Sequence, residues 1–421
     1  MTSEYRDTVR WPLIGLAAIA LTILLHLLPL PYALWSSLPG RELIVESFSQ
    51  VGMETPAMPL TMSPFAAWNS LFSLLVPAVT LLLAALVSTH NSKRLLLVLL
   101  IILGVNGLLA MLQLLGQDHS SFYLYRITNN GDAVGLFANR NHSALFFACG
   151  FPLIAAWITH VRGPDHHVRA MKWLAAIAAG LLVPLILVTG SRAGLLLGFV
   201  GMLYAYAIYQ EPIPSFRARK AGMSPKLLKG LGALAILAIV TLSAFSVRET
   251  ALDRVSSTSF SEEDRIKLIP TFVEMARDTF PVGAGAGAFV PLYKVYEGDA
   301  FLSPRYFNHA HNDIFETLIE YGLPGLIFML LAVVAWGVVT VRLVKQMLAA
   351  RSKAQPASVS VSLGLAGSAI ALIAMLGSIG DYPLRVPSVA ALTAIAIVWM
   401  LSAKNVSAAN ANKPHNSTTI K

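Results

Sequence analysis

The sequence predicts an all-α integral membrane protein. Of its 421 residues, 56% are hydrophobic and 13% are charged, and the mean hydropathy is +0.65. This composition is typical of chains that cross a bilayer many times. The apolar residues also fall into stretches of about 20 residues, the length that an α-helix needs to cross the hydrocarbon core. One long polar segment, roughly residues 246–321, interrupts the series.

Ten apolar stretches are candidate membrane spans. The first is too long for a secretory signal peptide and has no small-residue cleavage site, so we expect it to be retained. Because ten is an even number, both termini are expected on the same side. In chain order the stretches are roughly Trp11–Leu30, Pro64–Val87, Leu95–Leu115, Ser143–Ile158, Trp173–Val188, Leu195–Ile208, Leu231–Phe245, Leu323–Val341, Val361–Ile379 and Pro387–Leu401.

The charged residues predict the orientation. With these spans, the side that holds the termini carries 19 Lys/Arg and 4 Asp/Glu, a net charge of +15, and the opposite side carries 12 and 18, a net charge of −6. This bias is typical of a bacterial inner-membrane protein whose basic side is cytoplasmic. The overall charge of +9 therefore reflects topology and does not indicate nucleic-acid binding. A single cysteine, Cys149, excludes an intrachain disulfide and a cysteine-based zinc site.

We divide the chain into residues 1–245, seven spans with short loops; 246–322, a periplasmic loop subdomain; and 323–421, three spans and a cytoplasmic tail. In the loop, residues 261–264 (Ser-Glu-Glu-Asp) predict the start of a helix that extends to about Phe280. Gly283, Gly285 and Gly287 follow it. They alternate too closely for a dinucleotide-binding fingerprint, so we expect a hinge or a close backbone approach.

A polar sequence, Asn308 to Asn312, closes the long loop before an amphipathic helix predicted over Asp313–Tyr321. Gly322 suits the left-handed end of that helix, and Pro324 suits the first turn of the next. The apolar side of the helix consists of Ile314, Phe315, Leu318 and Ile319. The polar side consists of Asp313, Glu316, Thr317 and Glu320.

His309, His311 and Asn312 are expected at the start of this helix, where free backbone N–H groups favour an anionic ligand. The alternative is two histidines in an ordinary polar loop.

Two arginines are candidates for binding an anion. Arg192 lies in a short turn between two apolar spans, where a charge is costly unless it reaches the headgroups or binds a counter-ion. Arg265 lies near the start of the loop helix, and its alternative partners are Glu262 and Glu263. The two arginines and a histidine would suit a diphosphate, because guanidinium binds phosphate bidentately and imidazole can remove a hydroxyl proton.

Two further clusters leave alternatives open. Residues 262–264 could hold a metal ion, although we favour helix capping there. The sequence Asn139-Arg140-Asn141-His142 at the start of a span is either an interfacial cap or a wall of the site.

At this point the chain resembles the O-antigen ligase and O-antigen polymerase superfamily. His311-Asn312 followed after nine residues by Gly322-Leu-Pro-Gly325 matches the His-[Asn/Ser/Gln]-x9-Gly-x-x-Gly pattern of bacterial O-antigen ligases, and Arg192 to Leu196 matches their Arg-x3-Leu element. The resemblance covers roughly residues 135–345. It implies a GT-C-like fold. Ligases of this family often have twelve spans, whereas ten are counted here from the apolar stretches.

The resemblance also implies a reaction. Members are similar to metal-independent, inverting glycosyltransferases that use an undecaprenyl-diphosphate-linked glycan as donor and no cofactor. His311 would be the general base, and Arg192 and Arg265 would bind the diphosphate. We assign His309, Asn312, Asn139 and Arg140 to substrate binding, and expect His309 to point away from His311.

Three functions remain to be compared. The first is a ligase that joins the glycan to lipid A-core, and the second is a polymerase that joins repeat units to a growing glycan. A lipid-linked glycan transporter is third. It would predict ionisable residues in mid-span and inverted repeats, whereas the spans here are almost free of charge. In each of these functions the protein is surrounded by membrane lipids, and for the ligase and the polymerase the site is expected on the periplasmic face.

Overall fold

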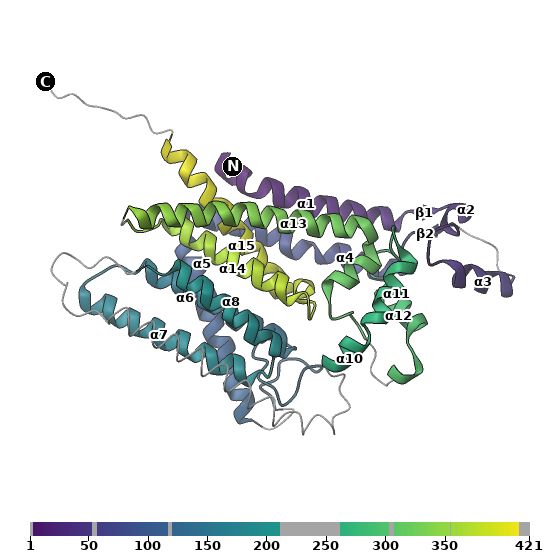
Figure 1. The fold of residues 1–421 in the computed structure, drawn as a ribbon, viewed down its shortest axis with the longest axis horizontal. Coiled ribbons are helices and arrows are strands. Elements are labelled where there is room, and N and C mark those ends of the chain that lie inside the picture. The colour runs from purple at the N-terminus through teal and green to yellow at the C-terminus, as the bar shows by residue number, and fades with distance from the viewer. Residues whose placement is uncertain are drawn as a thin grey trace.

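The computed structural model describes residues 3–52, 57–116, 120–210, 262–302, 307–353 and 355–411. Helices make up most of these residues, and the strands among them are one antiparallel pair, β1 (Pro29–Leu30) with β2 (Met58–Pro59). Long helices lie side by side in a bundle, and short elements gather at one end (Figure 1). The predicted all-α class is confirmed.

Within the described residues, seven helical segments are long and apolar enough to cross a membrane. They are α1 (Ser3–Leu27), α4 (Pro64–Ser73) with the first part of α5 (Leu75–Leu115), the second part of α5 from Asn91, α6 (Arg140–Thr159), α7 (Asp165–Val188), α13 (Asp313–Ser352) and α14 (Val359–Gly377). Two apolar helices are shorter, α8 (Arg192–Ile208) and α15 (Pro387–Ala411), the latter apolar as far as Ala403.

Nine of the ten predicted spans therefore coincide with helices. The other, residues 231–245, lies outside the described part of the chain, as does the proposed boundary at residues 245 and 246. The number of spans and the division into three regions stay predictions.

Helix α6 lies at the centre of the bundle and is buried along almost its whole length. Its neighbours are α5, α7, α8 and α14. Close approach of α6 and α8 depends on small residues, because Gly194 touches Ala144 and Gly201 lies against the carbonyl group of Ala148. Such contacts are typical of helix pairs in membranes. Helices α7 and α13 instead expose many leucine and valine side chains, as surfaces that face lipid do.

Two predicted boundaries were wrong because of proline. Helix α1 ends at Leu27 instead of Leu30, since Pro29 cannot donate a helical hydrogen bond and residues 29 and 30 pair with β2. The single loop helix is two helices, α10 (Glu262–Lys267) and α11 (Ile269–Thr279). Pro270 lies in the first turn of α11, where its missing N–H is tolerated.

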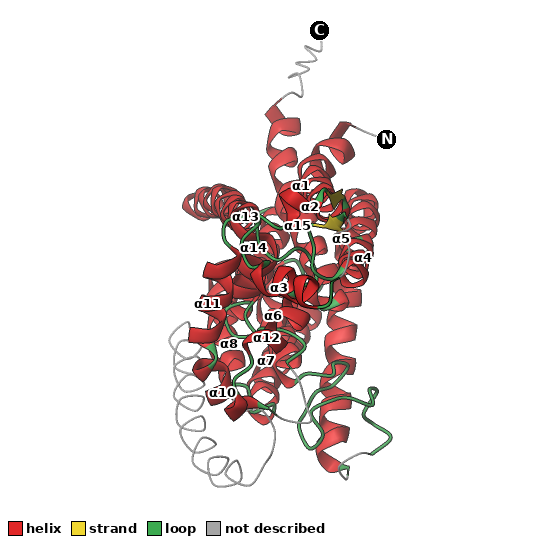
Figure 2. Ribbon diagram, turned by 90° about the vertical axis from the view of Figure 1, so that its right-hand side faces the viewer, coloured by secondary structure: helices red, strands yellow, loops and turns green. Residues whose placement is uncertain are grey.

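The remaining short elements lie at the end of the bundle where α10 and α11 lie, which Figure 2 shows facing the viewer. They are α2 (Tyr32–Trp35), α3 (Glu42–Gln50), α12 (Phe289–Tyr296) and the 3-10 turns η1 (Asp299–Phe301) and η2 (Pro383–Arg385).

The glycine-rich segment 283–287 is a close backbone approach, not a hinge. Gly283, Gly285 and Gly287 all have positive φ. A Cβ on Gly285 would overlap the backbone of Thr61, and one on Gly283 would meet the backbone of Glu320. Backbone hydrogen bonds continue on both sides, from Met62 N to Ala284 O (3.0 Å) and from Ala284 N to Ile319 O (2.8 Å). The segment therefore joins the connection between β2 and α4, which contains Thr61 and Met62, to α13.

We expect Gly285→Ala to destabilise the protein, because the new Cβ would meet backbone at a position with φ +95°. A cost of about 1–3 kcal/mol for each such conflict predicts a lower melting temperature and lower yield in detergent. The matched control is Gly298→Ala in the same region, where a Cβ would meet nothing within 4 Å. Equal thermal stability of the two variants would contradict the assignment.

Candidate active site

The candidate site lies where the first residues of α6 and α13 meet the connection between α14 and α15. Helix α10 lies at the same end of the bundle (Figure 1). Two hydrogen bonds attach the α14–α15 connection to the start of α13: Asp313 N donates to Ser378 O (2.9 Å), and Asn312 Nδ2 donates to Ile379 O (2.8 Å). Residues distant in the sequence are thereby brought together.

His311 is paired with Asp381. Its Nδ1 lies 3.0 Å from Asp381 Oδ1, and the Asp381 carboxylate is buried. The other carboxylate oxygen accepts hydrogen bonds from Asn139 Nδ2 (3.0 Å) and Asn141 Nδ2 (2.8 Å), while Tyr382 N donates to Oδ1 (3.0 Å). Because Asp381 accepts from Nδ1–H of His311, Nε2 is left with a lone pair.

Electrostatics favours a neutral imidazole beside an ionised carboxylate. Burial lowers the pKa of His311 below its ordinary value, and the hydrogen bond to Asp381 opposes that shift only in part. Burial alone would raise the pKa of Asp381, but the hydrogen bond from His311 and the nearby positive charges lower that pKa below its usual range. A neutral imidazole oriented by a carboxylate is a suitable general base.

Asn312 is the N-cap of α13. Its Oδ1 accepts hydrogen bonds from Ile314 N (3.0 Å) and Phe315 N (3.1 Å), and Asp313 N is bound to Ser378 O. The expectation that free N–H groups here would bind an anion was therefore wrong, because the cap satisfies them. His311, directly before the cap, has a positive φ of 49°, which is uncommon for a residue other than glycine.

The acidic side of the predicted helix is its most buried side. Helix α13 does begin at Asp313 and bends at Gly322, which has a φ of +56°. However, Asp313, Glu316 and Glu320 are all buried. The α14–α15 connection supplies their counter-ion: Arg385 lies 3.1 Å from Asp313, 3.2 Å from Glu316 and 3.5 Å from Glu320.

His309 does not point away from His311, which corrects the expectation from sequence. Its ring centroid lies 4.2 Å from that of Tyr382, and the His311 centroid lies 5.0 Å from the same ring. His309 Nδ1 is also 2.8 Å from Glu316 Oε1. The two histidines therefore belong to one cluster and share an aromatic neighbour.

Arg265 also joins this cluster. Its Nη1 donates to Gly380 O at 3.2 Å, and its charge lies close enough to His311 to lower the pKa of that histidine. The side chains of residues 262–264, the alternative metal-binding sequence, lie outside the described part of the chain.

Arg192 and Arg140 lie on the adjoining edge of the bundle, at the first residues of α8 and α6. The contact between Gly194 and Ala144 brings these two helix ends together. Arg140 is paired with Asp132 (3.2 Å), and a Cβ on Gly190 would be 3.7 Å from its Nη1. Arg140 therefore lies beside the turn that leads to Arg192.

Sequence reasoning missed Asp381, Tyr382 and Arg385 as site residues. All three lie in the short turn between the last two spans. The sequence did contain one indication of this site. Asp381 and Arg385 are opposite charges at the ends of apolar helices, where charged groups usually have a partner. Within the sequence Asn139 to His142, Asn139 caps α6 through its Oδ1 and also binds Asp381 through its Nδ2.

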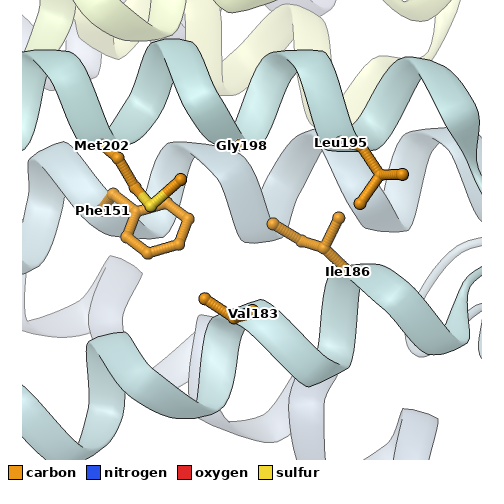
Figure 3. A pocket seen from close by; sticks show the side chains of 6 residues that line it. All are labelled: Phe151, Val183, Ile186, Leu195, Gly198 and Met202. Atoms are coloured by element: carbon orange, nitrogen blue, oxygen red, sulfur yellow. The ribbon is translucent and has the colours of Figure 1, made fainter. Parts of the chain in front are cut away.

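An apolar cavity lies between α6, α7 and α8 (Figure 3). Its lining has no charged or hydrogen-bonding side chain and consists of Phe151, Val183, Ile186, Leu195, Gly198 and Met202. Such a lining cannot recognise a phosphate or a sugar, so the chemistry is assigned to the polar cluster around Asp381.

Comparison with known families gives one match. Residues 174–330 match the family model described as O-Antigen ligase. This part of the chain is therefore similar to the O-antigen ligase superfamily. The matched range contains Arg192, Arg265 and His311, whereas Asp381 lies beyond it. A search of curated proteins found no match.

The match and the apolar helices indicate a multi-pass membrane protein of the ligase or polymerase kind, similar to glycosyltransferases. For the superfamily in general the match implies lipid-linked glycan and lipid A-core as partners.

We expect Asp381→Asn to lower turnover about 10- to 100-fold, because the residue that orients His311 loses its charge. Activity requires neutral His311 and is lost as the pH falls through its pKa. Since Asp381 raises that pKa, the acidic limb of the kcat/KM profile should move to lower pH in the variant. Asp299→Asn, at an exposed carboxylate in η1, is the control. An acidic limb at the same pH in Asp381→Asn and in the wild type would contradict the pairing of His311 with Asp381.

Proposed function

We propose that this protein is an O-antigen ligase that transfers a glycan from an undecaprenyl-diphosphate-linked donor to a hydroxyl group of lipid A-core. The observation that carries this proposal is the His311–Asp381 pair, next to Arg265, in a chain similar to the O-antigen ligase superfamily. A polymerase of the same superfamily, which would use the growing glycan as acceptor, is the second candidate.

In the proposed reaction His311 acts as the general base. Its Nε2 takes the proton of the acceptor hydroxyl while the acceptor oxygen attacks the anomeric carbon. The bond from that carbon to the diphosphate oxygen breaks, and the electron pair leaves with the diphosphate. Attack opposite to the leaving group inverts the anomeric centre. Asp381 stabilises the imidazolium that forms, as carboxylates paired with catalytic histidines do.

Arg192 and Arg265 are proposed to neutralise the leaving diphosphate. Guanidinium groups remain charged at any relevant pH and bind phosphate oxygens in pairs. Two such groups can stabilise the developing negative charge electrostatically. We therefore propose a metal-independent, inverting enzyme with a GT-C-like fold. Asn139, Arg140 and Asn312 are proposed to form the walls of the site.

We propose that the site faces the periplasm from the inner membrane. Support comes from the charge bias, since Asp381, Arg265 and His311 all fall on the side with net charge −6. The buried ionised groups lie at the end of the bundle, outside mid-span positions, and this arrangement favours an enzyme over a transporter.

Deletion of the gene should test the function directly. A ligase deletion should leave full-length glycan chains on the carrier lipid and no glycan on lipid A-core. Wild-type protein should restore the transfer, and His311→Ala, inserted in equal amount, should lower it about 10²–10⁴-fold, the contribution of a general base. Single repeat units stranded on the carrier would indicate a polymerase. Near-normal transfer by His311→Ala would remove the mechanism.

Transfer by the purified protein should survive excess EDTA, because the arginines replace a metal ion at the diphosphate. Loss of activity on chelation, with recovery on adding magnesium or manganese, would contradict this proposal and shift attention to residues 262–264. The control is Arg265→Ala, which should weaken donor binding equally with and without EDTA.

A further inference from the structure

The site contains a second histidine–carboxylate pair. His309 Nδ1 lies 2.8 Å from Glu316 Oε1, and Glu316 Oε2 accepts a hydrogen bond from Ala310 N at 2.8 Å. Arg385 holds the same carboxylate at 3.2 Å. Because Glu316 is 2% exposed and has three partners, it fixes the ring of His309. The His309 side chain itself is 28% exposed, so its remaining nitrogen, Nε2, is available to a ligand.

Tyr382 sets the distance between the two imidazoles. Both rings contact it, at centroid distances of 4.2 Å for His309 and 5.0 Å for His311. Each ring directs its Nδ1 to a buried carboxylate, so each keeps Nε2 as its free nitrogen. A ligand with two neighbouring hydroxyl groups could contact both histidines at once.

The charges near His309 disfavour a diphosphate on that side. Three buried carboxylates, Asp313, Glu316 and Glu320, share the counter-ion Arg385, so negative charge exceeds positive charge among these four groups when the acids are ionised. An anionic ligand would be repelled there. The positive group beside Asp381 is Arg265, on the α10 side of the cluster. A neutral, hydroxyl-rich molecule fits the His309 side.

We propose that His309 binds the acceptor sugar, accepting through Nε2 a hydrogen bond from a hydroxyl group next to the one that His311 deprotonates. The subsite rests on the proposed function, since it presupposes that His311 deprotonates an acceptor hydroxyl. It assigns the two histidines to two hydroxyl groups of one sugar ring. The donor diphosphate lies on the arginine side, so His309 does not touch the donor.

Two substitutions test the two ring nitrogens of His309 one at a time. His309→Asn keeps an N–H group near the position of Nδ1 for Glu316 and removes Nε2. His309→Gln can place its amide oxygen near the position of Nε2. Both are assayed as full-length protein in lipid nanodiscs, with undecaprenyl-diphosphate-linked glycan as donor and rough lipid A-core as acceptor. Release of glycan to water, measured without acceptor, reports donor binding and His311 chemistry alone.

We expect His309→Asn to raise the KM for lipid A-core about five- to tenfold, as expected for one lost hydrogen bond. The donor KM and the rate of donor hydrolysis should stay unchanged, and His309→Gln should restore most of the acceptor KM. The matched control is His166→Ala, an exposed histidine at the start of α7, which should change none of these values.

Equal losses of transfer and donor hydrolysis in His309→Asn would overturn the subsite, because they would indicate a structural role for His309. A raised donor KM would also overturn it by placing His309 on the donor side. Both results leave the proposed function intact. Failure of the wild-type protein to transfer glycan to lipid A-core or to a second glycan chain would instead overturn the proposed function, and the subsite with it.

Discussion

The buried carboxylate of Asp381 is the constraint on which the arrangement of the site depends. An ionised carboxylate is costly to bury unless charged or hydrogen-bonding partners surround it. Here the partners come from three separate parts of the chain: Asn139 and Asn141 at the start of α6, His311 before α13, and the backbone of Tyr382. Satisfying one charge therefore fixes the relative positions of two helix starts and the α14–α15 connection.

The buried carboxylates of α13 also fix the position of the α14–α15 connection, through Arg385. Although burial lowers the pKa of Arg385, the carboxylates of Glu316, Glu320 and Asp313 raise it above its ordinary value, so the guanidinium stays charged. Because removing one member of such a buried network leaves another charge without its partner, these contacts specify one geometry. The backbone of residues 283–285, which is hydrogen-bonded to α13 and lies against Thr61, then joins the connection between β2 and α4 to that helix.

Local sequence patterns predicted the features of the fold that depend on residues close together in the chain. Apolar length located the helices, and the bend at Gly322 followed from the residue type that such a position favours. The cap at Asn312 was not predicted. The His311–Asp381 pair could not be predicted, because the two residues lie 70 positions apart and no local periodicity relates them. Amphipathic spacing showed that Asp313, Glu316 and Glu320 share one side of α13. Whether that side is buried depends on Arg385, which lies on another element.

The distribution of charge gives the site a direction. In the proposed transfer, negative charge develops on the diphosphate while positive charge develops on His311. Arg265 and Arg192 suit the first charge, and Asp381, which is hydrogen-bonded to His311, suits the second. If the acids of α13 lay beside the leaving group they would oppose its departure, since like charges in a partly buried site repel strongly. Their position behind His309, held by Arg385, keeps them away from the diphosphate, and the neutral sugar is then the substrate that this side can accept.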